Sequence, residues 1–364
     1  MKYLYLSFLI SIGSSLQAQI INIPDANFKN ALVNTLCVDF DNNGVFENDV
    51  DTNNDGEIQL SEALAIHWSL QIANRSISSL EGIQYFTNLD RLYCVDNNLT
   101  QIDVSALSQL VTLNCGFNAL TQLDVSQNTN LKNLYCYRNG LFNIDVSNNL
   151  NLEELNAAYN NLVQLQVTDN PNLKLLEFTE NYVTQIDVTQ NPNLDHLRFD
   201  HNRVLDLNVS ENPNLRVLWV DHNRLRSLNL ENGNNPHLDV LETRHNPNLL
   251  CLLVDDVNYA NSRPCLVSNF TWCKDEHTEY STECIFSIDD FESRHISIYP
   301  NPVRHTLQIS AHADFDIIQI YSLSGTLLKQ SSNSQIGISE FPSGIYFALI
   351  SKGAKSVTKK FIKY

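Results

Sequence analysis

The feature that most constrains this chain is a sequence unit that returns every 21 residues. Hydrophobic residues keep a fixed register in it, in the pattern LxxLxLxxNxL. The asparagine of the pattern stands at Asn97, Asn118, Asn139, Asn160, Asn181, Asn202 and Asn223, and once more at Asn246 after a step of 23. A unit this short cannot bury its own apolar face, so the copies must stack on one another as a solenoid.

Within each unit, the residues around the central leucine alternate between apolar and other side chains, as in a strand. Leu92 and Cys94 are therefore predicted to face the core, and Tyr93 to face outward. About nine units lie between Leu70 and Leu241. They predict about nine coils whose parallel strands form one curved sheet.

The recurring asparagine has a chemical reason. Where the chain leaves each strand inside the stack, backbone N–H and C=O groups lose both water and strand partners, and a carboxamide can donate and accept. Replacing one such asparagine by leucine should leave buried groups unpaired, at a cost of about 1–3 kcal/mol. The first unit has Arg75 at this position and is the imperfect start of the array.

The repeats of residues 67–250, with their return segment LTQLDVSxNxNL, resemble the leucine-rich repeat in a short bacterial version. The resemblance implies an α/β-type repeat solenoid with a parallel β-sheet on its concave face. It also implies a scaffold for binding, without naming the ligand.

Composition and the two ends of the chain narrow the class of protein. The net charge of −18 gives no basic excess for binding nucleic acid. Residues 1–18 have one early lysine, an apolar run and a small residue at the end, which is the plan of a secretory signal peptide. No later stretch has the length and apolarity of a membrane span. We therefore expect an exported protein in which disulfides can form.

Residues 19–66 form the expected N-terminal cap and contain an EF-hand-like calcium loop. The stretch DTNNDGEIQLSE places oxygen-bearing side chains at alternate positions and glycine at the sixth. The predicted ligand residues are Asp51, Asn53, Asp55, Glu57 and Glu62. We expect structural Ca²⁺ that closes the open end of the solenoid, and the plainer alternative is an acidic turn.

A second stretch in this cap, DFDNNGVFENDV, matches the calcium-loop pattern less well. Valine stands where the final glutamate is wanted, so Asp49 or Asp51 would have to substitute for it. The predicted ligands of this weaker loop are Asp39, Asp41 and Asn43.

Three of the eight cysteines, Cys94, Cys115 and Cys136, share one inward column of the repeats. We expect small buried thiols there, because a metal site would need a fourth ligand and a nucleophile would need exposure and a base. Cys37 has no obvious partner.

Four other cysteines lie in residues 251–284, just after the last repeat. We expect a disulfide-stapled C-terminal cap there, which covers the open end of the core. Of the three possible pairings, we favour Cys251–Cys284 and Cys265–Cys273.

The outward side chains on the strands and their exits form the candidate ligand-binding face. The early coils carry aromatic residues and the later coils carry charged ones, so the predicted face comprises Tyr93, Phe117, Tyr135, Tyr137, Tyr159, Arg198, Asp200, Trp219 and Asp221. Aromatic side chains on a rigid sheet suit a protein or glycan ligand. The alternative is that large aromatics simply cover the sheet.

Two neighbouring units read FDHNR and VDHNR and so place Asp200 beside Asp221 and His201 beside His222. A shared divalent ion is one interpretation. A solvated rim is the interpretation we favour, because these positions repeat with the scaffold. The sequence lacks GxSxG and a phosphate-binding glycine loop, and no catalytic residue is predicted.

After a polar linker at 285–296, the pattern changes to short alternating segments separated by Ser, Gly, Asn and Pro, typical of a small all-β, Ig-like sandwich at 297–364. The segments IYPNPVRHTLQIS, QIYSLSGTLLK, FPSGIYFALI and TKKFIKY resemble the C-terminal sorting domain (type A) of the bacterial type IX secretion system. The resemblance implies recognition by the outer-membrane translocation machinery and removal of the domain, with release or surface attachment.

Together these features predict a secreted or cell-surface leucine-rich-repeat protein, not an enzyme, that presents its concave sheet to an extracellular protein or glycan, as in adhesion. Two alternatives stay open. One is a structural component of a surface layer, and the other is a metal-dependent enzyme with its site on the concave rim.

Overall fold

The computed structural model describes residues 19–265, 271–284, 296–311, 315–323, 325–353 and 355–364. The predicted signal peptide, and all of the predicted linker except Ile296, lie outside the described residues. The chain divides into two compact units, residues 1–283 and 284–364, and each is described by itself.

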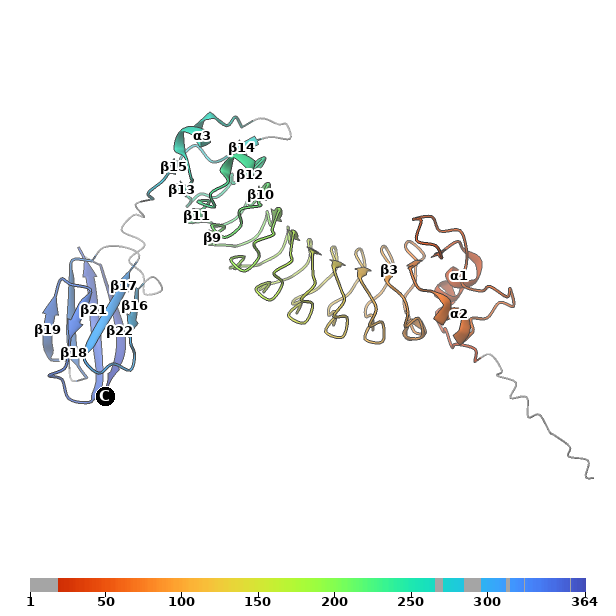
Figure 1. Cartoon of the computed structure of the whole chain (residues 1–364), viewed down its shortest axis with the longest axis horizontal. Helices are drawn as coiled ribbons and strands as arrows, with labels where there is room; N and C mark the ends of the chain where they lie inside the picture. The colour runs from red at the N-terminus through yellow and green to blue at the C-terminus, as the bar shows by residue number, and fades with distance from the viewer. Residues whose placement is uncertain (1–18, 266–270, 285–295, 312–314, 324, 354) are drawn as a thin grey trace, which may run out of the picture. The chain divides into compact units, whose positions relative to one another are not determined.

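The first unit is a solenoid whose coils stack in chain order (Figure 1). Its main sheet has the strand order β1-β2-β3-β4-β5-β6-β7-β8-β10-β12-β14, antiparallel between β1 and β2 and parallel from there on. These strands are β1 (Val38–Asp39), β2 (Ser69–Gln71), β3 (Arg91–Tyr93), β4 (Thr112–Asn114), β5 (Asn133–Tyr135), β6 (Glu154–Asn156), β7 (Leu175–Glu177), β8 (His196–Arg198), β10 (Val217–Trp219), β12 (Val240–Glu242) and β14 (Thr271–Cys273).

The register of this sheet follows the sequence repeat. Leu92 pairs with Leu113, and Leu113 with Leu134, so each central leucine lies beside its equivalent in the next coil. These leucines are fully buried, and each contributes about 1.5–3 kcal/mol by leaving water. One continuous hydrophobic cluster runs from Ile21 to Trp272. The predicted parallel solenoid is confirmed.

A second parallel sheet, which the sequence did not predict, lies on the return side of the last coils. Its order is β15-β13-β11-β9, and its strands are β9 (Asp206–Asn208), β11 (Ser227–Asn229), β13 (Cys251–Leu253) and β15 (Glu279–Ser281). The equivalent residues of the earlier coils are in turns and irregular segments. The late coils are therefore paired along two sides.

The N-terminal cap contains α1 (Ala26–Asn34), α2 (Leu60–Ala65) and, where it meets the repeats, the short 3-10 helix η1 (Ile83–Tyr85). Phe28, Ala31 and Leu32 of α1 are buried at helical spacing and join the solenoid core. Asp25 caps this helix, since its Oδ1 accepts hydrogen bonds from the second and third residues after it.

The C-terminal cap also extends the main sheet. Trp272 of β14 pairs with Leu241, so an indole takes the place of one more central leucine. Its Nε1 donates to the Leu238 carbonyl oxygen at 2.9 Å, which satisfies the one polar atom of the ring. The cap also contains α3 (Val257–Ser262), and η2 (Asn235–His237) lies just before β12.

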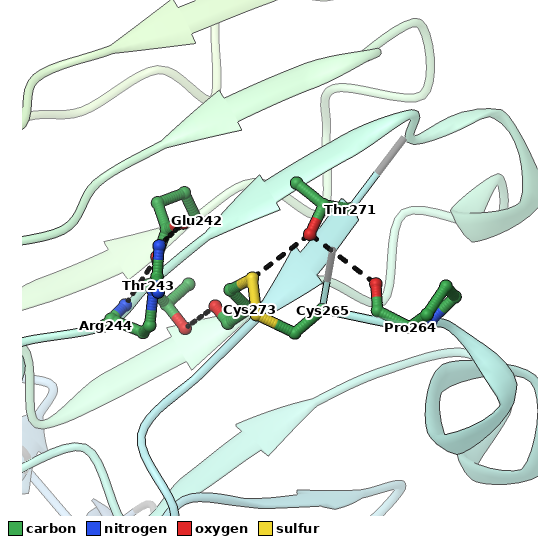
Figure 2. The surroundings of a disulfide bond; sticks show 7 residues. All are labelled: Glu242, Thr243, Arg244, Pro264, Cys265, Thr271 and Cys273. Atoms are coloured by element: carbon green, nitrogen blue, oxygen red, sulfur yellow. Dashed lines mark hydrogen bonds and ion pairs between the residues drawn. A yellow bond between two sulfur atoms is a disulfide. The ribbon is translucent and has the colours of Figure 1, made fainter. Parts of the chain in front are cut away.

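A disulfide holds this extension in place (Figure 2). Cys265 and Cys273 are bonded, with their Cα atoms 4.8 Å apart. Thr243 Oγ1 donates to the carbonyl oxygen of Cys273 at 3.1 Å and so connects the disulfide to the residue that follows β12. Cys251 and Cys284 are also disulfide-bonded, whereas Cys37, Cys94, Cys115 and Cys136 are free and buried.

The second unit is an antiparallel all-β domain, as predicted. One sheet has the order β16-β17-β20 and the other β19-β18-β21-β22. Ile309, Ile320 and Phe361 come from different strands and share one buried cluster. The strands are β16 (Ile296–Tyr299), β17 (Thr306–Ala311), β18 (Ile317–Ser322), β19 (Leu327–Ser331), β20 (Gln335–Gly337), β21 (Gly344–Lys352) and β22 (Lys355–Lys363).

Candidate functional site

Two outward columns run across the main sheet, and we take them together as the concave face. The first is formed by the last residue of each repeat strand: Gln71, Tyr93, Asn114, Tyr135, Asn156, Glu177, Arg198, Trp219 and Glu242. The second, which we call the exit column, lies two residues later: Val95, Gly116, Tyr137, Ala158, Thr179, Asp200, Asp221 and Arg244. The side chains of the strand column are half-buried from Gln71 to Trp219, because neighbouring coils cover their flanks.

The ladder of asparagines fixes the backbone at which these side chains leave the strands. Asn118 Nδ2 donates to the carbonyl oxygens of Cys94 and Cys115 at 3.0 and 3.1 Å, and its Oδ1 accepts from Leu99 N at 3.0 Å. Each asparagine therefore ties two successive coils together. The same bonds recur at Asn139, Asn160, Asn181, Asn202, Asn223 and Asn246.

The residue just before each ladder asparagine has a left-handed backbone, which the sequence did not reveal. The φ angle is positive at Asp96, Phe117, Arg138, Tyr159, Glu180, His201, His222 and His245. Such a conformation costs a non-glycine residue about 1–2 kcal/mol and is held here by the hydrogen bonds on either side. It turns these side chains outward in one further column, which borders the concave face.

Aromatic and guanidinium groups pack together over the early coils. The rings of Phe117 and Tyr137 meet edge to face with centroids 5.5 Å apart. The Arg138 guanidinium lies 5.0 Å from the Phe117 ring and 4.2 Å from the Tyr159 ring. Gly116 makes room for this cluster, because a Cβ there would come within 2.7 Å of the Tyr137 ring.

The middle coils carry polar pairs between neighbouring strands. Tyr135 Oη donates to Glu154, and Asn156 Nδ2 donates to Glu177 Oε2 at 3.0 Å. Partial burial, together with the hydrogen bond to Glu154, raises the pKa of Tyr135 well above its usual range. Further along, the Arg198 guanidinium lies 5.0 Å from the Trp219 ring. The predicted face is thus an array of side chains that already hold one another.

The histidines of the late coils stack beside this array. The ring centroids of His201 and His222 are 4.2 Å apart, and those of His222 and His245 are 3.9 Å apart. Asp200 and Asp221 each accept from the Nδ1 atom of the following histidine, at 3.1 and 2.6 Å. The predicted column of histidines and aspartates is therefore close-packed.

The first predicted calcium loop curls around its acidic side chains. Asp51 accepts from the backbone N–H groups of Asp55 and Gly56 at 3.1 and 2.8 Å. Asn53 Oδ1 accepts from Asp55 N, and Glu62 Oε1 accepts from Asn53 N. Gly56 has a φ of 83°, which glycine tolerates at the tight turn. The loop thus directs these oxygens toward its own interior.

The last two predicted ligands of this loop differ in role. Both oxygens of Glu62 face the loop backbone, since Oε2 accepts from Gln59 N at 2.9 Å. The carboxylate of Glu57 instead forms an ion pair with Lys29 at 2.7 Å. Partial burial and the nearby charges of Asp51 and Glu62 raise the pKa of Asp49.

The second predicted loop repeats the turn of the first. Asp39 accepts from Asn43 N at 3.2 Å and from Gly44 N at 3.0 Å, just as Asp51 accepts from Asp55 and Gly56. The φ angles agree as well, at 59° for Asn42 and Asn54 and at 84° and 83° for the two glycines. Asn43 Nδ2 donates to Asp41 at 3.1 Å. Val50, at the final ligand position, is buried in the core.

Burial sets the ionisation of the thiols in the inward column. Burial raises the pKa of Cys115 to about 12 and raises the pKa values of Cys94 and Cys136 well above their usual range. A thiolate is the reactive and metal-binding form, so these cysteines behave as small apolar side chains.

The comparisons with known proteins cover the two units separately. Residues 297–364 match the family described as the secretion system C-terminal sorting domain. No curated protein matches the chain. None of the helices in the described part of the chain combines the length and the apolarity needed to cross a bilayer.

Solved structures resemble the solenoid. An internalin (inlF) from Listeria monocytogenes has 23% identity and a TM-score of 0.50, with 67% of this chain and 75% of that chain covered. An internalin C2 from the same species has 22% identity and a TM-score of 0.47, covering 57% and 90%. A leucine-rich-repeat protein from Leptospira interrogans has 21% identity and a TM-score of 0.45, covering 59% and 68%.

The sorting-domain match implies contact with the secretion machinery and removal of the tail after export. The chain therefore combines a solenoid of the leucine-rich-repeat fold with a C-terminal domain that matches the secretion system sorting domain, which indicates a secreted or outer-membrane surface-attached protein.

Proposed function

We propose that the protein is a non-catalytic binding protein whose concave face, from Tyr93 to Trp219, holds an extracellular protein or glycan. The observation that carries the proposal is the packed array of aromatic and arginine side chains on this face and in the column that borders it. Arg138 lies between two aromatic rings, and Arg198 lies beside a third. Aromatic and arginine side chains supply most of the binding energy at many interfaces.

The rigidity of the array favours tight binding. Strand pairing, the asparagine ladder and the left-handed exits fix the backbone, and contacts such as Tyr135 with Glu154 fix the side chains. A ligand therefore meets groups that lose little conformational entropy on binding. Phe117 and Tyr159 remain 45% and 42% exposed, so apolar surface is available to a partner.

We also propose that the N-terminal cap binds structural Ca²⁺. The residues fit the ion, because Asp51, Asn53, Asp55 and Glu62 direct their oxygens into one loop, and the chain turns there at a glycine. The Glu57 carbonyl would complete this set. Bound Ca²⁺ would neutralise the repulsion between these carboxylates. The second loop shares the turn but lacks the final glutamate, so we expect weaker binding by Asp39, Asp41 and Asn43.

A direct test is to screen the purified full-length protein, in calcium, against an array of glycans and a panel of bacterial and host surface proteins. We expect saturable binding to a member of one class. Tyr135→Ala and Trp219→Ala should each weaken that binding by about tenfold or more, as hot-spot substitutions do.

Tyr182 supplies the matched control. It is 43% exposed and lies 4.6 Å from an arginine, but it follows Asn181, past the strand and exit columns. Tyr182→Ala should leave binding unchanged. Equal losses in all three variants, or self-association with no foreign ligand, would contradict the proposal.

A further inference from the structure

The stacked histidines of the late coils have the composition of a transition-metal site. Among the described residues, His201, Asp221 and His222 offer ligand atoms that all lie within 4.8 Å of one another. The three residues belong to two successive coils, so the period of the solenoid places them together. The two histidines lie in the column that borders the concave face, and the proposed recognition of a macromolecule does not use them as ion ligands.

One carboxylate oxygen in this cluster lacks a partner. Asp200 Oδ1 accepts a hydrogen bond from Thr179 Oγ1 in the preceding coil, at 2.7 Å. In the next coil, Asp221 takes the position that Asp200 has here. The residue that precedes Asp221 in the exit column is Asp200 itself, which has no hydroxyl group to donate. Asp221 Oδ1 is buried and has no hydrogen-bond partner among the described residues. A buried carboxylate oxygen without a donor is costly, and a cation satisfies it.

The histidines are held in a form that suits metal binding. The Nδ1 atoms of His201 and His222 lie 3.1 and 2.6 Å from the carboxylates of Asp200 and Asp221. For His201, the carboxylate of Asp200 on Nδ1 fixes the tautomer and leaves the lone pair of the other nitrogen for an ion. Asp221 is itself a candidate ligand, so its hydrogen bond to His222 must open when both residues bind one ion. Both residues have a left-handed backbone, at φ 55° and 50°, so the two rings start from equivalent positions.

Side-chain rotation alone can bring the ligand atoms of the cluster from within 4.8 Å of one another to the spacing around one ion. Zinc ligands at about 2.0–2.1 Å from the ion lie about 3.3 Å from one another in a tetrahedron. The two rings are stacked 10° from parallel, so one ring must tilt to bring its nitrogen to a shared ion. The side chains of His201 and His222 are 44% and 41% exposed, which leaves space for that tilt.

The surrounding charge also permits a cation. Asp200 and Asp221 bring two carboxylates to neighbouring positions of the exit column. The next residue in this column is Arg244, but its guanidinium is engaged by both carboxylate oxygens of Glu242, at 2.7 and 2.6 Å. The guanidinium that follows the cluster in this column is thus already paired with Glu242, although Asp221 also acts on its charge.

We propose that His201, His222 and Asp221 bind one divalent transition-metal ion, with Zn²⁺ as the best match to nitrogen and carboxylate ligands. Asp200 acts on His201 as a positioning residue. His245, whose ring stacks on that of His222, borders the site. The ion would lie at the edge of the concave face.

The test is a titration of tag-free full-length protein with Zn²⁺ by calorimetry, after removal of metals and in saturating Ca²⁺. We expect uptake of one Zn²⁺ per molecule. His222→Ala and Asp221→Asn should each lower the affinity at least about tenfold. Co²⁺ in place of Zn²⁺ should give a visible absorption band of tetrahedral type, and His222→Ala should remove it.

His196 is the matched control. Its Nδ1 lies 2.7 Å from Asp195, so it has the same carboxylate partner, but it lies outside the cluster. His196→Ala should bind Zn²⁺ like the wild type, and thermal melting should show that all variants are folded. The proposal is overturned if the wild type takes up no Zn²⁺, if His222→Ala binds it unchanged, or if His196→Ala loses it equally.

Discussion

At the scale of single residues, asparagine occurs in three series with the period of the repeat. The ladder series was predicted from the sequence. A second series in the return segment is fully buried, and it comprises Asn128, Asn149, Asn170, Asn191 and Asn212. A third is exposed and makes one bond per residue, as Asn172 does to the Leu150 carbonyl. The same residue type at the same period therefore meets three environments.

We expect the buried return series to be as important for stability as the ladder. Asn170 Nδ2 donates to the carbonyl oxygens of Val146 and Asn149 at 3.0 and 2.9 Å. Asn170→Ala leaves both carbonyls without this donor, and should lower the free energy of unfolding by about 2–3 kcal/mol. Chemical denaturation measures the loss.

Asn172→Ala is the control for this prediction. Its side chain is exposed and donates once, so the cost should stay below about 1 kcal/mol. Equal costs for the two variants would show that burial of the donor does not set the effect.

At the scale of elements, two side chains at the start of α1 join it to the first coil: Asn27 Nδ2 donates to the Ser76 carbonyl oxygen at 3.0 Å, and Asp25 makes the larger set of hydrogen bonds. Asp25 Oδ1 caps the helix, and Oδ2 accepts from Ser78 N and Ser79 N at 2.8 and 3.0 Å. Burial alone would raise the pKa of Asp25, but its four backbone N–H donors outweigh burial and lower it. The folded cap thus stabilises the ionised carboxylate of Asp25.

This lowered pKa gives a pH dependence of defined sign. The stability that Asp25 contributes is complete above the unfolded-state pKa of about 3.9, and is lost as the pH falls through the lower folded-state pKa. Asn can still cap the helix, but its amide nitrogen cannot accept from Ser78 N and Ser79 N as Oδ2 does. Asp25→Asn should therefore cost about 1–2 kcal/mol at neutral pH and make the loss of stability in acid shallower. Melting temperatures measured from neutral pH to about pH 2 test both effects.

Asp256→Asn provides a comparison at the other end of the solenoid. Asp256 caps α3 by accepting from Asn258 N and Tyr259 N. If the hydrogen bonds from Asp25 to the first coil contribute to stability, Asp25→Asn should lower the melting temperature more than Asp256→Asn does. The opposite order would mean that capping alone explains the effect.

At the scale of the whole molecule, stability passes from coil to coil, because each coil contacts only its neighbours. The N-terminal cap, which covers the apolar end of the first coil, therefore stabilises the later coils as well. The two predicted calcium loops lie in the N-terminal cap, where Ile21 N donates to the Ile58 carbonyl oxygen and joins the start of the described chain to the first loop. Ion binding to the loop should raise the free energy of unfolding of the solenoid.

We expect Ca²⁺ to raise the melting temperature relative to chelator. An ion that binds the folded state alone adds about 2.7 kcal/mol at a concentration 100 times its Kd. Glu62→Gln should abolish most of this gain. Glu57→Gln should retain it, because that position is expected to bind through its backbone carbonyl. Identical melting with calcium and with chelator would contradict the calcium proposal.

The sequence by itself determined the solenoid, because a period of 21 residues with one leucine and one asparagine in fixed register has no other way to bury its core. It also determined the sorting domain, whose motifs are local. The second sheet was decided by tertiary structure, because it forms only where the return segments of the late coils pair with one another. Trp272 as a further core layer was decided in the same way, since the spacing after Asn246 no longer follows the repeat. Tertiary structure also decided the left-handed backbone after each strand and left Asp221 Oδ1 without a hydrogen-bond partner. Both features depend on which residues of the neighbouring coil lie next to them.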